Sequence, residues 1–266
     1  MRKNLLLSIL FMMTSAVFSQ SGSKLNSENK VILFNGSNLD GWYTYVENRG
    51  RDIDPKNVFT VQEGMIRISG EEWGGITTEK EFENYHLTLE FKWGEKTFAP
   101  RLENARDSGI LLHSVGEYGA SDGKWMHSIE CQLIEGGTGD FIVVGDGSED
   151  FSITSSVAPE KQGNSYVYQA EGELATINRG RINWYGRDPG WKDVIDYRGS
   201  RDVEKPVGDW NVVECVVKGD EITIYLNGIL VNHAFNVKPR SGRIQIQSEG
   251  AEIFFRKVEL LALEKE

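Results

Sequence analysis

The sequence predicts an all-β protein built as a sandwich of two sheets, and three observations support this class. Residues 86–93 and 221–226 alternate apolar and polar side chains, the pattern of a strand with one buried face. The second run ends at Asn227-Gly228, a dipeptide typical of two-residue hairpin turns. Glycine is abundant, with 29 residues, and no stretch keeps the period of an amphipathic helix. Repeated short strands with one apolar face indicate two sheets packed together.

The first twenty residues carry the pattern of a secretory signal peptide. Arg2 and Lys3 precede an apolar run at 5–13, and small residues follow it. The run is too short to cross a bilayer comfortably, so we expect cleavage after Ser19 or Gln20 and no membrane span. The next polar, aperiodic residues indicate a linker. We therefore expect a signal peptide at 1–20, a linker at 21–30 and a single sandwich domain at 31–263.

Strand patterns continue through the rest of the chain. We predict strands at 59–61, 65–68, 229–231, 243–247 and 252–261, of which the first two form a hairpin and the last two a final strand pair. The stretch 139–208 is less regular and rich in Gly, Asp and aromatic residues. Long loops over a regular scaffold often build binding sites, so we expect these loops to cover one face of the sandwich. Surface loops with a few packed aromatic residues are the equal alternative.

Charge and cysteine content narrow the possible partners and compartments. The formal net charge is −11, which disfavours binding to nucleic acid phosphates and to anionic membrane surfaces. Cys131 and Cys215 both lie in apolar runs, so either one disulfide or two buried free thiols is expected. Neither cysteine has a partner at zinc-site spacing.

The segment around Glu130 is the first candidate site. In a strand, Glu130 and Gln132 point to one face, whereas Ile129, Cys131 and Leu133 point to the core. Loops over the polar face would desolvate Glu130 and raise its pKa, so that it could move protons or bind a metal. Glu135 joins the same face only if a bulge intervenes. A plain solvent-facing strand side is the alternative.

Other polar and aromatic residues could converge on the same surface. His113 falls on the face of Gly109 and Leu111 by alternation, and it is a candidate base or ligand. A surface or structural role is the alternative, because a lone histidine at a strand end more often has such a role. Gln247 and Glu249 share a face of the run at 243–247 and the residues after it. Trp73, Trp184 and Tyr185 would suit the apolar faces of sugar rings, or could equally be part of the core.

Several motifs together resemble the 3-keto-disaccharide hydrolase domain family. They are ILFNGSNLDGW at 32–42, TTEKEF at 77–82, DSGI at 107–110, SIECQ at 128–132, PVGDWN at 206–211, LNG at 226–228, GRIQIQSEG at 242–250 and FRKV at 255–258. The resemblance covers nearly all of the mature chain. It implies a concanavalin A-like lectin/glucanase (LamG-like) jelly roll, whose concave sheet binds carbohydrate.

The resemblance also implies an activity, that of a periplasmic enzyme acting on glycosides already oxidised at C3. The ketone acidifies the hydrogen on C2, a base removes it, the group on C1 leaves by elimination, and water then adds. On this interpretation Glu130 or His113 is the base, and the other donates a proton or holds a divalent cation that polarises the ketone. Gln132 would orient the substrate.

Two other functions stay open at this point. The run from Glu130 to Glu135 also resembles the E-x-D-x-x-E catalytic strand of laminarinase-like glucanases, with Gln132 in the place of the central Asp. This match predicts a direct glycosidase that uses both carboxyl groups. A lectin-like carbohydrate-binding module is the non-enzymatic alternative, because a fold does not fix a function.

Overall fold

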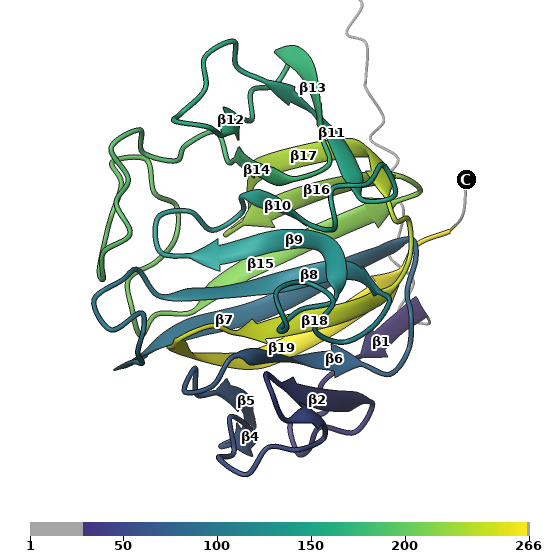
Figure 1. The fold of residues 1–266 in the computed structure, drawn as a ribbon, viewed down its shortest axis with the longest axis vertical. Coiled ribbons are helices and arrows are strands. Elements are labelled where there is room, and N and C mark those ends of the chain that lie inside the picture. Colours follow the sequence, from purple (N-terminus) through teal and green to yellow (C-terminus); the bar gives the residue numbers. More distant parts are fainter. Residues whose placement is uncertain (1–28, 265–266) are drawn as a thin grey trace, which may run out of the picture.

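The computed structural model describes residues 29–264. The predicted signal peptide and most of the predicted linker lie outside the described residues, and Lys30, at the linker's end, already begins the first strand. Strands are the regular elements of the described part, and they form two sheets that pack face to face (Figure 1). The predicted all-β, two-sheet fold is confirmed.

The ten-stranded sheet carries most of the long strands. Its spatial order is β13 (Glu173–Ile177), β11 (Ser152–Val157), β17 (Ile229–Lys238), β16 (Glu221–Leu226), β15 (Asn211–Lys218), β7 (Tyr85–Thr97), β19 (Ala251–Ala262), β5 (Met65–Ile68) and β4 (Phe59–Gln62), with β1 (Lys30–Ile32) also paired to β19.

The nine-stranded sheet carries the candidate site. Its spatial order is β12 (Tyr166–Val167), β14 (Gly180–Asn183), β10 (Phe141–Val144), β9 (His127–Ile134), β8 (Asp107–Val115), β18 (Arg243–Ser248), β6 (Gly74–Thr78), β2 (Trp42–Val46) and β3 (Gly50–Arg51). Its neighbouring strands are antiparallel except for the pair of β12 and β14.

The core lies between the two sheets and follows the predicted alternation. Ile129, Cys131 and Leu133 of β9 are fully buried in it, as are alternate residues of β7 and β15. Each such apolar side chain contributes about 1.5–3 kcal/mol by leaving water. Cys131 and Cys215 are both free and buried, and their thiols contact one another between the sheets.

One predicted pairing is wrong. The last two long strands, β18 and β19, are not partners: β18 pairs with β6 and β8, whereas β19 pairs with β7 and β5. Only Glu249 and Gly250 connect them, and Gly250 has a φ of 83°, which lets the chain cross between the sheets. Alternation shows which face of a strand is buried, but it does not show which sheet the strand joins.

The irregular stretch holds the short strands β10 to β14 and then a segment without strands between β14 and β15. That segment, residues 184–210, forms the long green loop at the left of Figure 1. It lies beside β7, the start of β8 and the end of β9, where its side chains bond to the side chains of Trp93 and Arg106 and to the backbone carbonyl of Glu135. The described residues include no helix long and apolar enough to span a membrane.

Candidate active site

A hollow of about 440 Å³ opens on the outer face of the nine-stranded sheet. This size lies within the range of about 300–1,000 Å³ typical of small-molecule sites. Side chains of β8, β9 and β18 that point away from the core form its floor. We call it the carboxylate hollow, and its polar lining includes Asp107, Glu130, Gln132, Arg181, Gln247 and Glu249.

Glu130 lies on the floor of this hollow. Its backbone sits between Leu111 of β8 and Ile142 of β10, and only 3% of the residue is exposed. Its Oε1 atom accepts no hydrogen bond from any described residue. Burial, and then the negative charge of Asp107, raise the pKa of Glu130 to about 8. A carboxyl group with a pKa near the working pH can both accept and return a proton.

A glycine brings two oxygen atoms together above the sheet. Gly109 of β8 faces the hollow, directly opposite Gln132 of β9. A methyl group built on Gly109 would lie 2.2 Å from Glu130 Oε1 and 2.2 Å from Gln247 Oε1. Gln247 Oε1 is buried and also without a partner. The two oxygens therefore converge over the backbone of Gly109 and are free to bind a ligand.

Two more carboxyl groups share the hollow with Glu130. Asp107 Oδ1 accepts a 2.6 Å hydrogen bond from Gln132 Nε2, and Asp107 Oδ2 lies 3.1 Å from Arg101 Nη2. Burial and the charge of Glu249 raise the pKa of Asp107, and burial and the charge of Glu130 raise that of Glu249 to about 8. Three carboxyl groups this close cannot all ionise at neutral pH.

A buried aspartate holds the basic side of the hollow in place. Asp140 is fully buried, and its Oδ2 accepts from Arg181 Nη1 at 3.0 Å and also from Arg187 Nη1. Its Oδ1 accepts from the backbone N–H of Trp184 at 2.7 Å. These bonds fix the Arg181 guanidinium, whose charge lowers the pKa of Glu130 and so opposes the effect of burial.

Stacked indoles form the opposite wall. Trp125 lines the hollow, and the ring of Trp73 stacks on it with centroids 6.1 Å apart. Both pack against Leu111 and Val144 on the outer face of the sheet. The hollow therefore combines carboxyl groups, amides and an aromatic wall, the side-chain types that recognise sugar hydroxyls and ring faces.

Comparison with known proteins identifies the family of the chain. The model of the 3-keto-alpha-glucoside-1,2-lyase-like domain family matches residues 29–261. The chain belongs to this family. The family confirms the predicted resemblance and places the chain among carbohydrate-active enzymes. A search of the curated proteins found no match.

Solved structures with this fold are similar to the family member described here. A provisionally assigned glycosyl hydrolase from Parabacteroides distasonis is 18% identical over 89% of this chain and 95% of its own, with a TM-score of 0.52. A second such protein from the same organism is 18% identical over 88% and 99% of the two chains, with a TM-score of 0.49. At this identity the first likeness shows the fold alone.

The structure brings five of the predicted site residues together in this family member. Glu130, Gln132, Gln247 and Glu249 line the carboxylate hollow, and Trp73 supports its aromatic wall from behind Trp125. The sequence alone did not single out Asp107, Gly109, Trp125 and Arg181. The alternation of the run at 107–112 could have placed Asp107 and Gly109 on the same face as Leu111, next to Glu130.

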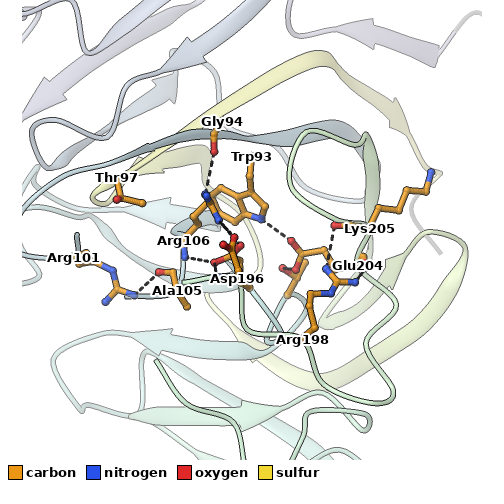
Figure 2. Close-up of polar contacts among 12 residues, drawn as sticks. Trp93, Gly94, Thr97, Arg101, Ala105, Arg106, Asp196, Arg198, Glu204 and Lys205 are labelled. Carbon is orange, nitrogen blue, oxygen red and sulfur yellow. Dashed lines mark hydrogen bonds and ion pairs between the residues drawn. The ribbon is translucent and has the colours of Figure 1, made fainter. Parts of the chain in front are cut away.

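Glu135 lies outside the hollow. Its Oε1 is 2.7 Å from Arg106 Nη1, and its Oε2 accepts from the backbone N–H groups of Arg106 and Asp196. Arg106 also bonds the Gly94 carbonyl and Asp196, as Figure 2 shows. Glu135 follows the end of β9, and no bulge returns it to the face of Glu130. It anchors the loop instead of forming a carboxyl pair with Glu130.

His113 also lies apart from Glu130, because the strand does not stay regular. A bulge between Leu112 and Val115 gives His113 a φ of 54° and turns the ring between the sheets. There it packs edge-on against Tyr85 and its Nδ1–H donates to the Pro239 carbonyl at 2.7 Å. Burial lowers the pKa of His113 to about 4, so the ring is neutral. His113 is not among the residues that line the carboxylate hollow.

The two other predicted aromatics are not on the wall of the hollow. Trp184 is only 1% exposed and belongs to the core between the sheets. Tyr185 is 39% exposed and stacks edge-on against Trp184, away from the lining of the hollow. The chain enters a turn at Tyr185, and this residue faces water while its neighbour stays in the core.

The expected divalent cation finds no ready ligand set in the part of the chain that is described. No group of three or more His, Cys, Asp and Glu side chains at 29–264 is arranged to hold a metal ion. Asp107 is already engaged by Gln132 and Arg101. The divalent cation therefore stays a prediction.

Proposed function

We propose that the chain is an exported enzyme that cleaves 3-keto-glycosides by elimination between C1 and C2. The observation that carries this proposal is the buried Glu130 carboxyl, unpartnered at Oε1, on the floor of a sugar-sized hollow. The family description names a 1,2-lyase, which agrees with this bond change. The signal-peptide pattern at 1–20 supports export, to the periplasm of a bacterium.

The reaction needs a base for a carbon acid. Ionised Glu130 takes the C2 proton, and the electrons of that C–H bond move onto the C3 oxygen as an enolate. When the ketone re-forms, those electrons make the C1–C2 double bond and the C1–O bond breaks. Water then adds across the double bond. General base catalysis of this kind contributes about 10² to 10⁴ in rate.

Each remaining polar group has a place in this scheme. Gln132 donates to Asp107, which fixes the amide beside the substrate ring. Protonated Asp107 or Glu249 can supply the proton that the leaving oxygen needs, because both carboxyl groups have a raised pKa. The wall of Trp125 covers the apolar face of the ring.

The proposal is tested with matched substrates and variants. The wild type should release sugar from a 3-keto-glucoside and leave the unmodified glucoside intact. Glu130→Gln should lower kcat/KM by at least about 10², because the amide has no basic oxygen. Glu173→Gln, a change on an exposed residue of β13, should have no effect.

Other outcomes would identify the alternatives. Cleavage of the unmodified glucoside would indicate a direct glycosidase, and binding without cleavage of either substrate would indicate a lectin. Full activity of Glu130→Gln would contradict the assignment of the base. A chelator added to the wild-type assay tests the predicted cation in the same experiment.

A further inference from the structure

Arg181 of β14 lines the carboxylate hollow and lies in register with the proposed base. Ile142 of β10 pairs with Glu130 on one side and with Arg181 on the other. Residues directly opposite one another in antiparallel strands share a face, so the three side chains form a row across the outer face of the sheet. Two strand spacings, about 10 Å, separate the backbones of Glu130 and Arg181. The long arginine side chain can bridge this gap over Ile142.

The Arg181 guanidinium keeps most of its hydrogen-bond donors available. An arginine side chain presents a fork of N–H donors on three nitrogen atoms. Toward the described residues Arg181 uses Nη1, which donates to Asp140 Oδ2 at 3.0 Å. The side chain is 26% exposed, so the other N–H groups are open to the hollow. They can therefore donate to an oxygen atom of a ligand bound there.

The other arginines near the hollow are bound to the protein itself. Arg101 Nη2 lies 3.0 Å from Asp193 Oδ1 and 3.1 Å from Asp107 Oδ2. Arg179, on the turn before β14, donates from Nη2 to a backbone carbonyl at 2.9 Å. The charge of Arg181, by contrast, lowers the pKa of each of the three carboxyl groups in the hollow. Arg181 is therefore the cation best placed to act on a negative charge within the hollow.

A buried network holds this cation in place. Asp140 is fully buried, and its Oδ2 accepts from both Arg181 and Arg187. Its Oδ1 accepts from the backbone N–H of Trp184, which ties the network to the chain beside β14. Because two arginines share one carboxylate, the network carries an excess of positive charge. A cation fixed in advance stabilises a developing negative charge better than a mobile one, since it need not reorganise during the reaction.

We propose that Arg181 is a catalytic residue that binds the C3 oxygen of the substrate and stabilises the enolate formed there. This proposal rests on the proposed function, in which Glu130 takes the C2 proton. As the C2–H bond breaks, its electron pair moves onto the C3 oxygen, so the negative charge passes from the Glu130 carboxylate to that oxygen. Arg181 keeps its own protons and donates hydrogen bonds to the charged oxygen. The same cation therefore faces the negative charge before and after the proton moves.

The test removes the guanidinium and follows two bonds of the substrate separately. A 3-keto-glucoside with deuterium at C2 is incubated with the wild type, Arg181→Met and Arg256→Met. In Arg181→Met, kcat should fall by at least about 10² with little change in KM, because the lost hydrogen bonds strengthen only as the enolate forms. Loss of deuterium to water and release of the sugar should fall together. Arg256→Met is the control and should match the wild type, because Arg256 is exposed on the other sheet and pairs with Glu90.

Two further measurements show whether Arg181→Met lacks only this group. Thermal unfolding checks that the variant is folded, and guanidinium chloride at a non-denaturing concentration should restore part of its activity but none of that of Glu130→Gln. Arg181→Lys keeps the charge, so its kcat should fall less than that of Arg181→Met. It takes the place of the methionine variant if that one does not fold.

The outcomes separate this inference from the proposed function. If Arg181→Met lost deuterium at the wild-type rate but released the sugar slowly, Arg181 would act on the leaving group. If KM rose while kcat stayed unchanged, Arg181 would serve binding alone. Either result overturns the enolate role and leaves the activity standing. A wild type that does not cleave the 3-keto-glucoside would overturn the proposed function and this inference with it.

Discussion

At the scale of single residues, the chemistry depends on the environment of one carboxyl group. Glu130 is held on a rigid strand, is buried by the loops above it, and lacks a donor at Oε1. Alternation along β9 predicted its direction, because a strand side chain two positions from Gln132 must share its face. The lack of a donor could not be predicted, since it depends on Gly109 and Gln247 of neighbouring strands.

The raised pKa of Glu130 predicts how stability varies with pH. Below about pH 4.5 the group is protonated in the folded and unfolded states, but between about pH 4.5 and pH 8 only the folded state keeps the proton. The free energy of unfolding therefore falls as pH rises through this window. Glu130→Gln should remove this loss and be more stable than the wild type at pH 8, by on the order of 4 kcal/mol. Urea unfolding across this pH range measures the difference.

The urea unfolding measurements across pH include Glu173→Gln as a control variant. Glu173 is exposed, so Glu173→Gln should follow the wild-type curve at every pH. If the free energies of unfolding of Glu130→Gln and of the wild type differed by the same amount at every pH from 4.5 to 8, the burial of a protonated Glu130 would be contradicted.

Gly109 gives a second prediction at this scale. An alanine methyl at this position meets Glu130 Oε1 and Gln247 Oε1, which are the ends of flexible side chains. Gly109→Ala should therefore fold but displace both groups, and kcat/KM should fall about 10²-fold, as for other small misplacements of catalytic groups. Kinetics and a melting curve measure the two effects. An active alanine variant would show that these oxygens do not need to converge.

At the scale of elements, the loop between β14 and β15 is held against the sheets by buried carboxyl groups. Buried Glu135 and Arg106 anchor one part of it, and Glu204 anchors another by accepting from Trp93 Nε1 at 2.6 Å (Figure 2). The sequence indicated a loop rich in aromatics, but it did not show that Glu135 serves the loop. Sequence spacing alone cannot tell a catalytic carboxylate from one paired with an arginine far away in the chain.

This anchoring predicts a large loss of stability in Arg106→Met. The change leaves Glu135 buried without its cation, and breaking a buried ion pair in this way costs about 3–5 kcal/mol. Arg49→Met is the control, because Arg49 pairs with Glu72 at the surface and its loss should matter far less. Urea unfolding of both variants at neutral pH makes the comparison, and equal losses would contradict the anchoring role.

At the scale of the whole molecule, two sheets present one buried core and one functional outer face. Local alternation predicted several of the long strands, the hairpin of β4 and β5, the hairpin of β16 and β17, and the core side of β9. It did not predict the separation of β18 from β19 or the inward turn of His113 at a bulge, and it left the burial of Trp184 open. Each of these depends on contacts between distant segments, which a local pattern does not contain.

The packed core also predicts the behaviour of the cysteines. Cys131 and Cys215 are buried free thiols between the sheets, so a thiol reagent should reach them only when the sandwich opens. We expect no labelling of the native protein and two equivalents in urea. Two equivalents in the native protein would contradict the tight packing, and none in urea would indicate a disulfide.

The most direct test of the central claim follows the proton on C2. A 3-keto-glucoside carrying deuterium at C2 is incubated with the wild type and with Glu130→Gln. We predict that the wild type loses the deuterium to water as the glycosidic bond breaks, and that Glu130→Gln leaves both the label and the bond in place. Release of the sugar with its C2 deuterium retained would contradict proton abstraction by Glu130.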